Sequence, residues 1–338
     1  MADGKLDSEE AIIAELWAPL AAGFPGAFGL ADDCAAITPP SGCDLIVTTD
    51  AVIAGVHFFD GEDAGAIAWK ALAVNVSDLI AKGATPLAYL MTIALPQAPE
   101  RAWLEGFVGG LSAAQTTFGC HLAGGDTDRT PGPLSVSITA MGTVPQGRMV
   151  HRASARPGDV VLVSGTIGDA TLGLALRRNP DFVRRWKLDA DASESLIVRQ
   201  LRPRPHVALA DVVRQGATAA MDISDGLVKD FTRLCNAAGV QGRIDATRIP
   251  LSPAARTVLS HGGATLVELL TGGEDYEVLM TVAADRVAEV RAMASAVGVT
   301  LTEIGSILGA GQGAHVFDAD NRVIDFAATG WDHFSTPR

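Results

Sequence analysis

Short acidic segments recur along this chain, and most of them lie beside glycine or small hydroxyl residues. They are Ala31–Cys34, Thr48–Asp50, Asn75–Asp78, Gly124–Asp128, Asp222–Gly226 and Gly272–Asp275. Each has an ordinary structural explanation, since an Asp before a helix is usually an N-cap and Gly-Gly-Asp is usually a tight turn. Together, at places where strands end or helices begin, they are typical of ligand-binding positions in α/β folds.

One acidic segment falls on a helix that the sequence predicts over 64–82. Residues three and seven apart share a helix face, so Asn75, Asp78 and Lys82 form a polar strip on an otherwise apolar helix. An internal salt bridge would satisfy this strip, but the nearby segments offer little positive charge. Carboxylates that cluster without Lys or Arg repel one another unless they are protonated or bridged by a cation. Mg²⁺, which prefers oxygen ligands, is the natural cation for such a site.

Two glycine-rich segments could present backbone N–H groups to a phosphate bound with that Mg²⁺. They are Gly124–Gly125 and Gly165–Gly168, and each is equally compatible with a plain turn. The P-loop pattern, the kinase H-R-D and D-F-G signatures and the G-x-S-x-G pattern of α/β-hydrolases are all absent. The sequence therefore predicts Mg²⁺ and phosphate chemistry outside those enzyme classes.

Composition limits the possible partners and compartment. The chain has 26 basic and 39 acidic residues, a net charge of −13, which excludes binding of nucleic acid or an anionic membrane through bulk charge. The 4 cysteines form no paired metal-ligand spacing and are expected to be free thiols. The acidic N-terminus, Met1–Leu20, lacks a signal-peptide layout, and apolar runs such as Leu87–Leu95 are too short to span a membrane. We expect a soluble, cytoplasmic protein.

The elements that must position the acidic segments fall into two predicted domains, because 338 residues exceed one ordinary core. The boundary is expected near residue 150, before the turn Arg156–Asp159. The first half begins with a helix from Ser8 that Pro19 and the glycines after it should end. It then becomes mostly β, with strands at Leu45–Val47, Pro86–Leu95 and Leu134–Val144. The second half alternates strands with helices and predicts an α/β domain, with strands at Val160–Val163, Thr218–Ile223 and Tyr276–Val282 and helices at Gly226–Ala238 and Asp285–Val297.

Taken together and in this order, the segments resemble the thiamine-monophosphate kinase family, whose superfamily includes aminoimidazole ribotide synthetase and selenophosphate synthetase. The resemblance spans nearly the whole chain. It rests on DDCAAI at Asp32–Ile37, TTDAVIAGVHF at Thr48–Phe58, KALAVNVSDLIAKGATP at Lys70–Pro86, AGGDTDR at Ala123–Arg129, MDISDGLVKD at Met221–Asp230, TGGEDYE at Thr271–Glu277 and GWDHF at Gly330–Phe334.

The resemblance implies transfer of the γ-phosphoryl group of ATP to thiamine monophosphate, with several Mg²⁺ ions and no nucleic acid or membrane partner. It implies a two-domain α/β fold like that of aminoimidazole ribotide synthetase. Residues 1–150 would bind ATP and Mg²⁺ and dimerise, their mixed sheet pairing with that of a second subunit into a barrel in a homodimer. Residues 151–338 would form the C-terminal α/β domain.

Individual roles also follow from the resemblance. The implied Mg²⁺ ligands are Asp33, Thr48, Thr49, Asp50, Asp78, Asp126, Asp222 and Asp225, with Asp50, Asp78, Asp126 and Asp222 within bridging reach of one another. The implied nucleotide contacts are Phe118, Gly125, Arg152 and Ser224, and the implied substrate contacts are His57, Glu274 and Trp331. No catalytic side chain is implied, because a phosphate monoester with a second pKa of about 6 is already an anionic nucleophile at neutral pH.

Two residues depart from the family pattern. Ala31 stands where a glycine is usual, and a left-handed backbone there would cost about 1 kcal/mol. Phe118 stands where a tyrosine beside adenine is common, which would keep stacking and lose a hydroxyl contact.

Three other functions stay open at this point. The first is another ATP-using enzyme of the superfamily, although a selenophosphate synthetase should carry a reactive Cys in an N-terminal loop, and residues 1–30 contain none. The second is a Mg²⁺ phosphohydrolase, and the third is a non-enzymatic cation-binding module, which no D-x-D-x-D-G loop supports. The basic run Arg199–Arg204 is expected only to pack and be solvated.

Overall fold

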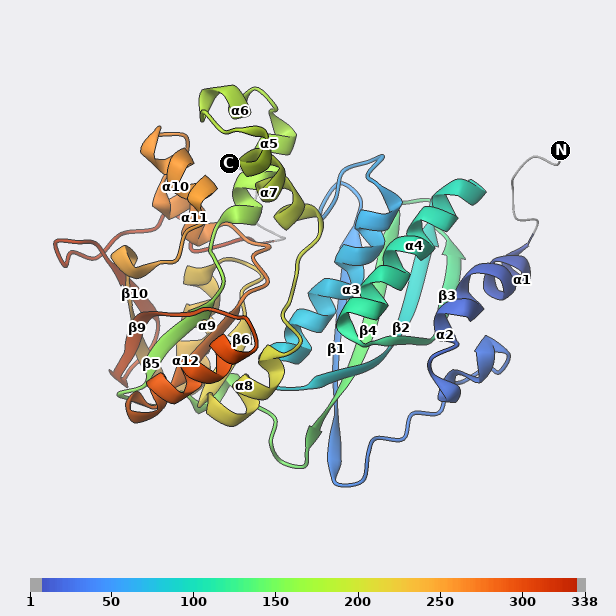
Figure 1. The fold of residues 1–338 in the computed structure, drawn as a ribbon, viewed down its shortest axis with the longest axis horizontal. Coiled ribbons are helices and arrows are strands. Elements are labelled where there is room, and N and C mark those ends of the chain that lie inside the picture. Colours follow the sequence, from blue (N-terminus) through green and yellow to red (C-terminus); the bar gives the residue numbers. More distant parts are fainter. Residues whose placement is uncertain (1–7, 333–338) are drawn as a thin grey trace. The chain divides into compact units, whose positions relative to one another are not determined.

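The computed structural model describes residues 8–332. Its backbone groups into two compact units, drawn as ribbons in Figure 1. Unit 1 comprises the chain up to Leu79 and from Ala84 to Met149, and unit 2 comprises Ile80–Gly83 and the chain from Val150 on. Both units combine a mixed sheet with helices, as the predicted fold class requires.

Unit 1 is built on a four-stranded sheet in the order β1-β4-β2-β3. The strands are β1 (Cys43–Ile53), β2 (Thr85–Leu95), β3 (His121–Arg129) and β4 (Ser135–Pro145). β4 pairs antiparallel with both β1 and β2, whereas β2 and β3 are parallel. The helices α3 (Ala64–Ala81) and α4 (Arg101–Phe118) lie on one face of this sheet, and α4 is the crossover between the two parallel strands (Figure 1).

The N-terminal helical segment of unit 1 ends at Ala21, between Pro19 and the glycines that follow, as predicted. Pro19 does not interrupt the segment, because it lies in the first turn of α2, which begins at Ala18 directly after a π-helical turn. The elements are α1 (Glu9–Ile12), the π turn η1 (Ile13–Trp17), α2 (Ala18–Ala21) and the 3₁₀ segment η2 (Pro25–Leu30). Proline is tolerated in the first turn of a helix, where its missing N–H has no partner to lose.

Unit 2 is built on a six-stranded sheet in the order β10-β7-β9-β5-β8-β6, in which only β10 and β7 pair in parallel. The strands are β5 (Val160–Ser164), β6 (Ala219–Asp222), β7 (Val240–Asp245), β8 (Val278–Val282), β9 (Leu301–Ala310) and β10 (Ala314–Phe317). The longer helices are α5 (Asp169–Arg178), α7 (Ala190–Leu201), α8 (Leu209–Gly216), α9 (Leu227–Ala238), α10 (Pro253–Ser260) and α12 (Val287–Ala296). The short helices are η3 (Arg152–Ser154), α6 (Phe182–Arg185), η4 (Ala246–Arg248), α11 (Leu266–Thr271) and η5 (Ala284–Arg286).

The apolar cores explain why these elements form. Every residue of β8 is buried. Leu279 of this strand belongs to one apolar cluster with Phe231 of α9 and Ile304 of β9. Among the helices that the structure describes, only α3 is long and apolar enough to cross a membrane, and 89% of its apolar window is buried inside the protein. Such burial is typical of a core helix.

The contact between α3 and α4 depends on glycine. A Cβ atom added at Gly110 would lie 2.2 Å from the carbonyl oxygen and 2.4 Å from the Cα atom of Gly65, so the two backbones touch. A Cβ atom added at the neighbouring Gly109 would meet nothing within 4 Å. Gly110 therefore faces the backbone of α3, whereas the neighbouring Gly109 faces open space.

We expect Gly110→Ala to destabilise unit 1 and Gly109→Ala to stabilise it. The clash at Gly110 should outweigh the gain in helix propensity and lower the free energy of unfolding by about 1–2 kcal/mol. Gly109→Ala gains the propensity alone, about 0.5–1 kcal/mol. Urea unfolding of the two variants and the wild type measures both changes, and shifts of the same sign would contradict the close contact between α3 and α4.

Candidate functional site

The polar strip on α3 meets β1 in unit 1. Thr48 Oγ1 donates to Asp78 Oδ2 at 2.6 Å, and the backbone N–H of Asp50 donates to Asn75 Oδ1 at 2.9 Å. Asn75 is fully buried, and its amide nitrogen donates to the Ala71 carbonyl at 3.0 Å, which fixes the orientation of the side chain. The structure thus brings together the Thr48–Asp50 and Asn75–Asp78 segments.

The strip is not an internal salt bridge. Lys82 belongs to unit 2, where its Nζ donates to the Ala220 carbonyl at 2.6 Å. Among the described residues, no Lys or Arg forms an ion pair with Asp78. Thr49 does not share the face of Thr48, because side chains alternate along a strand. Its Oγ1 donates to the Ile138 carbonyl at 3.1 Å and accepts from Thr139 Oγ1 at 3.1 Å.

A second group of predicted residues lines a cavity of about 740 Å³ in unit 1. Strands β2, β3 and β4 and the segment from Leu30 to Ile37 form its wall, and Asp33, Gly125 and Asp126 lie in it. No ion pair involves Asp33 or Asp126 in the part of the chain that the structure describes. The cavity is therefore acidic and lacks a compensating basic side chain at these two positions.

The segment Gly124–Asp128 lies in strand β3, so the expectation of a glycine turn there is wrong. A Cβ atom added at Gly125 would lie 1.8 Å from the Met91 carbonyl oxygen, and φ of Gly125 is 156°. Glycine is needed here because β3 packs closely against β2. Glycine is depleted in strands, so local propensity does not indicate a strand at this segment.

Sheet order separates two of the predicted ligands. Asp50 lies on β1 and Asp126 on β3, which are the opposite edges of the four-stranded sheet. Three strand spacings correspond to about 14 Å, so within one sheet these carboxylates cannot bind the same ion. Within residues 8–332 no group of three Asp, Glu, His or Cys side chains is close enough to hold a metal. The expectation that Asp50 and Asp126 lie within bridging reach is therefore not met inside a single chain.

In unit 2, the loop after β6 gathers five of the predicted residues. Asp222 is the last residue of β6 and is buried. The Ser224 carbonyl accepts from the backbone N–H of Glu274 at 2.8 Å, and the Asp225 carbonyl accepts from that of Trp331 at 2.9 Å. The predicted ligands and the predicted substrate contacts thus share one loop. The end of the last motif, His333 and Phe334, lies outside the described residues.

Asp225 is ion-paired, unlike Asp78. Its Oδ2 lies 3.1 Å from Lys229 Nζ and 2.7 Å from an Arg233 guanidinium nitrogen. Arg233 also contacts Asp230, a fully buried carboxylate that sequence reasoning missed. Burial raises the pKa of Asp230 and the Asp225 carboxylate raises it further, against the lowering effect of the Asp225 N–H and of Arg233. The only sequence signal for Asp230 was its place at the end of the MDISDGLVKD motif.

The TGGEDYE segment carries two left-handed residues that are not glycine. φ is 68° at Glu274 and 50° at Tyr276, a conformation that costs roughly 1–2 kcal/mol per residue. The Tyr276 N–H donates to the Ile223 carbonyl at 2.8 Å, which helps to hold the turn in this form. Glu274 Oε2 accepts from Gln200 Nε2 at 3.0 Å. Strain of this kind is concentrated at functional sites, where the surrounding structure enforces it.

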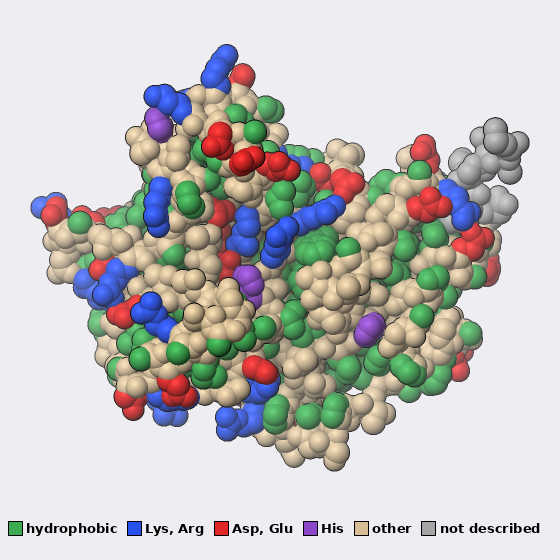
Figure 2. Space-filling model, viewed as in Figure 1, with side chains coloured by type: hydrophobic (Ala, Val, Ile, Leu, Met, Phe, Trp, Pro, Cys, Tyr) green, Lys and Arg blue, Asp and Glu red, His purple; other side chains and the backbone are tan. Residues whose placement is uncertain are grey.

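A network of polar side chains holds the end of this turn at Glu277. Ser164 Oγ donates to Glu277 Oε2 at 2.5 Å, and Arg199 donates to Glu277 Oε1 at 2.7 Å. Arg199, from the predicted basic run, therefore packs inward, whereas Arg202 and Arg204 are exposed. Figure 2 shows Lys and Arg side chains on the visible face around α7 and the segment that follows it.

Asp275, in the same turn, has an incomplete set of hydrogen bonds. Its Oδ1 accepts from the Gly168 N–H at 2.9 Å, but its buried Oδ2 has no hydrogen-bond partner. Burial raises the pKa of Asp275 well above its usual value, and the carboxylates of Asp169 and Glu277 raise it further, while the Gly168 N–H and Arg199 lower it. We infer that Asp275 holds a proton over part of the pH range in which exposed carboxyls are ionised.

The glycine-rich turn Gly165–Gly168 is structural. The N–H of Gly165 donates to the Thr300 carbonyl at 3.2 Å and that of Ile167 to the Pro250 carbonyl at 3.0 Å. With the Gly168 N–H bound to Asp275, three of the four amides are already used. The alternative of a phosphate-binding turn is therefore not supported.

The remaining predicted residues are more dispersed. His57 Nδ1 accepts from the Ile53 N–H at 3.1 Å, which places the proton of a neutral ring on Nε2. Arg152 is exposed in η3. Phe118 is 1% exposed, with its ring centroid 5.2 Å from that of Trp69, so contact with adenine would require it to leave the core. Ala31 has φ of −99°, and the strain anticipated there is absent.

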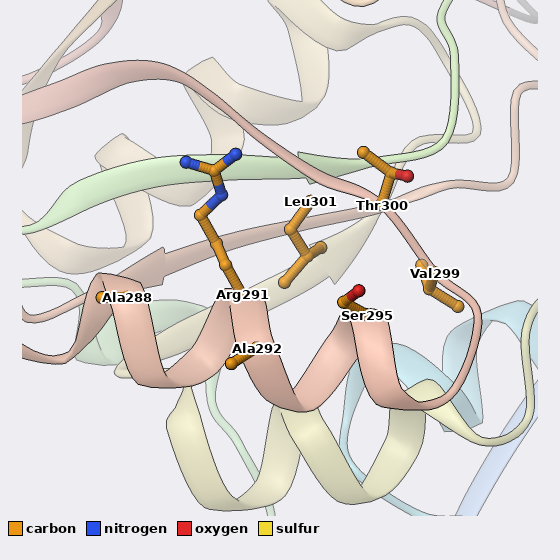
Figure 3. Close-up of a pocket in the computed structure, with 7 residues that line it drawn as sticks. All are labelled: Ala288, Arg291, Ala292, Ser295, Val299, Thr300 and Leu301. Carbon is orange, nitrogen blue, oxygen red and sulfur yellow. The ribbon is translucent and has the colours of Figure 1, made fainter.

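The groove between α12 and the start of β9, about 370 Å³ in volume, is a separate feature of unit 2. Figure 3 shows its lining, in which Arg291 is the one charged side chain. None of the predicted site residues lies in it, and it provides no cluster of ligands.

Comparison with known proteins places the chain in an established group. Residues 31–144 match the family model of the AIR synthase related protein N-terminal domain, and residues 156–318 match that of the C-terminal domain. The chain is 39% identical to thiamine-monophosphate kinase of Caulobacter vibrioides over 95% of this chain and 89% of the relative. It is 38% identical to the enzyme of that name from Salmonella typhimurium, over 91% and 92% of the two chains.

Solved structures agree with these matches. Thiamine-monophosphate kinase from Stenotrophomonas maltophilia superposes with a TM-score of 0.78 at 39% identity, covering 87% of this chain and 91% of that one. The structure described as AaThiL complexed with AMPPCP and TMP has a TM-score of 0.75 at 32% identity, covering 96% and 97%. The hydrogenase maturation protein HypE, at 18% identity and a TM-score of 0.74, shares the fold.

We expect Asp275→Asn to change how stability depends on pH. A carboxyl whose pKa is raised by folding loses its proton first in the unfolded chain, so the wild type should lose stability as pH rises above about 4, by about 1.4 kcal/mol per unit of raised pKa. The variant lacks this loss. Its free energy of unfolding in urea should therefore rise relative to that of the wild type between pH 5 and pH 8.

Asp245→Asn provides a control of opposite sign for this measurement. The hydroxyl of Thr247 chiefly lowers the pKa of Asp245, so that carboxylate stabilises unit 2 above its unfolded pKa. Its replacement should lower stability at pH 8. Parallel pH profiles for the wild type and Asp275→Asn would show that Asp275 is ionised in the folded chain.

Proposed function

Because the chain belongs to the AIR synthase related family and, within it, to the thiamine-monophosphate kinases, we propose that it transfers the γ-phosphoryl group of ATP to thiamine monophosphate. The products are thiamine diphosphate and ADP. The observation that carries this proposal is the match, over 96% of this chain, to a relative whose structure holds both AMPPCP and TMP. The distribution of carboxylates in both units supports the same chemistry.

The reaction needs no general base from the protein. The acceptor is a phosphate monoester with a second pKa of about 6, so its oxygen is already a nucleophile at neutral pH. The main barrier is repulsion between two polyanions, and catalysis depends on positioning and charge neutralisation. This requirement agrees with the Asp-rich segments of both units.

We propose Mg²⁺ as the neutralising cation, and the donor set fits it, because every ligand offered is an oxygen. The ligands in unit 1 would be Asp33, Thr48, Thr49, Asp50, Asp78 and Asp126, and those in unit 2 would be Asp222 and Asp225. Bound Mg²⁺ supplies positive charge to the transferring phosphoryl group and to the phosphate oxygens on either side of it. The protein's own contribution is to hold Asp78 through Thr48 and the main chain of Asp50 through Asn75.

The contacts with the two organic ligands follow from the same assignment. Gly125, Arg152 and Ser224 would contact the nucleotide, and Phe118 would do so only after leaving its buried position. His57, Glu274 and Trp331 would contact thiamine monophosphate. Its thiazolium ring is a permanent cation, and the Trp331 indole, 49% exposed, can attract it by about 0.5–2 kcal/mol. The Glu274 carboxylate adds charge complementarity.

We further propose a cytoplasmic homodimer in which a second copy covers the sheet of unit 1. Val47 on β1 and Leu90 on β2 are large apolar side chains with 56% and 38% of their surface exposed. The two residues lie on one sheet with β4 between their strands, and exposed large apolar side chains on a sheet are typical of an interface. Pairing of two such sheets into a barrel would also allow carboxylates from the opposite edges, β1 and β3, to approach each other across the two copies.

We expect the protein to phosphorylate thiamine monophosphate and to leave free thiamine unchanged. Free thiamine lacks the ionised phosphate oxygen that must act as the nucleophile. Incubation with Mg²⁺ and ATP, followed by chromatography of thiamine diphosphate, measures this. A parallel reaction without acceptor identifies a phosphohydrolase by steady release of phosphate. Comparable turnover of free thiamine would contradict the proposal.

Replacement of one proposed ligand in each unit tests the role of Mg²⁺. Asp78→Asn and Asp222→Asn should each lower turnover by at least about 10²-fold, because the lost charge weakens transition-state neutralisation. Asp44→Asn is the matched control, since Asp44 is a β1 carboxylate that only accepts a backbone N–H, from Gly147 at 2.8 Å. Wild-type turnover in both ligand variants would exclude a catalytic metal role for these residues.

A further inference from the structure

Asp230 lies under the loop that carries two of the proposed ligand contacts. It belongs to the first turn of α9, its side chain is fully buried, and its carboxylate points back toward the loop that precedes the helix. Oδ2 accepts two backbone N–H groups, from Ser224 at 3.0 Å and from Asp225 at 2.9 Å. One carboxylate oxygen therefore holds the main chain of both residues.

The carbonyl groups of the same two residues are also bound. Ser224 O accepts from the Glu274 N–H at 2.8 Å, and Asp225 O accepts from the Trp331 N–H at 2.9 Å. Every backbone polar group of this dipeptide is thus fixed, the N–H groups by Asp230 and the carbonyls by the two segments proposed to contact thiamine monophosphate. A shift of the dipeptide would displace those two segments as well.

The second oxygen of Asp230 balances charge at Asp225. Arg233 places one guanidinium nitrogen 2.9 Å from Asp230 Oδ1 and 2.7 Å from Asp225 Oδ2, so the two carboxylates share it. Lys229 adds a second cation at 3.1 Å from Asp225 Oδ2. Two carboxylates and two cations make this group neutral. Without the charge of Asp230, Arg233 would be directed at Asp225 alone, and the group would carry a net positive charge.

We propose that Asp230 is a positioning residue for phosphoryl transfer, which fixes the Ser224–Asp225 main chain and leaves the Asp225 carboxylate able to bind the Mg²⁺ of the nucleotide. The inference rests on the proposed function. A buried carboxylate is poorly suited to stability alone, because its desolvation offsets much of the energy of its ion pair. It is well suited to hold two N–H groups in one place, since hydrogen bonds to a charged acceptor are the strong ones.

Three variants change the charge of this group in steps. Asp230→Asn makes it +1, Arg233→Gln makes it −1, and the double variant restores zero; Asn keeps the shape of Asp230, and Arg233 is 41% exposed. Because attraction for a divalent cation follows this charge, Asp230→Asn should weaken binding of Mg²⁺ alone about tenfold, and Arg233→Gln should not weaken it. The double variant should recover most of the loss.

The experiment titrates MgCl₂ into the full-length protein by calorimetry and measures KM for ATP, KM for thiamine monophosphate and kcat in the same preparations. Asp245→Asn is the control, because Asp245 also accepts a backbone N–H, from Thr247 at 3.0 Å, outside the site. This variant should bind Mg²⁺ as the wild type does. The expected result is the ranking Arg233→Gln, wild type and double variant, then Asp230→Asn.

Wild-type binding by Asp230→Asn, or a double variant no better than Asp230→Asn, would overturn the proposal. If Asp230→Asn does not fold, Arg233→Gln still tests the proposal, because weaker binding by that variant would contradict the charge argument. Failure of the proposed function is a separate result, since the wild type would then not phosphorylate thiamine monophosphate.

Discussion

Repulsion between carboxylates is the constraint on which the rest of this structure depends. The fold places several Asp side chains in the candidate segments of each unit, and ionised carboxylates placed near one another raise each other's energy. Folding must therefore hold each carboxylate in place, either with neutral hydrogen-bond donors or within a group whose charges balance.

The two units meet this constraint differently. In unit 1, neutral groups do the positioning: the Thr48 hydroxyl binds the Asp78 carboxylate, and the Asn75 amide binds the main chain of Asp50. In unit 2, charge is balanced locally, with Arg233 shared between Asp225 and Asp230. Neutral donors leave the full charge of a carboxylate for a cation, whereas the balanced group fixes the loop more firmly.

Backbone strain marks the place where positioning takes priority over stability. The left-handed conformations of Glu274 and Tyr276 are held by hydrogen bonds to the 222–226 loop. The next residue of the turn, Glu277, forms an ion pair with Arg199. The unpartnered oxygen of Asp275 belongs to the same turn. A turn built only for stability would use glycine at these positions and would not bury an unsatisfied carboxyl.

The sequence by itself determined the periodic elements and the family. The apolar repeat of α3 predicted that helix and the polar strip of Asn75 and Asp78, because helical spacing is a local property of the chain. Seven ordered motifs identified the fold, the reaction and most of the candidate residues. Motifs identify the residues that a family shares, however far apart these residues lie in the chain.

Only the tertiary structure decided which of these residues meet. Gly124–Asp128 became a strand because β2 offers a close neighbour, which the glycines allow and local propensity opposes. Sheet order placed Asp50 and Asp126 on opposite edges, and no local signal encodes that order. Arg199 turned inward because Glu277, 78 positions away, lies buried beside it. Partners so far apart in the chain are chosen by packing, and packing exists only once the chain has folded.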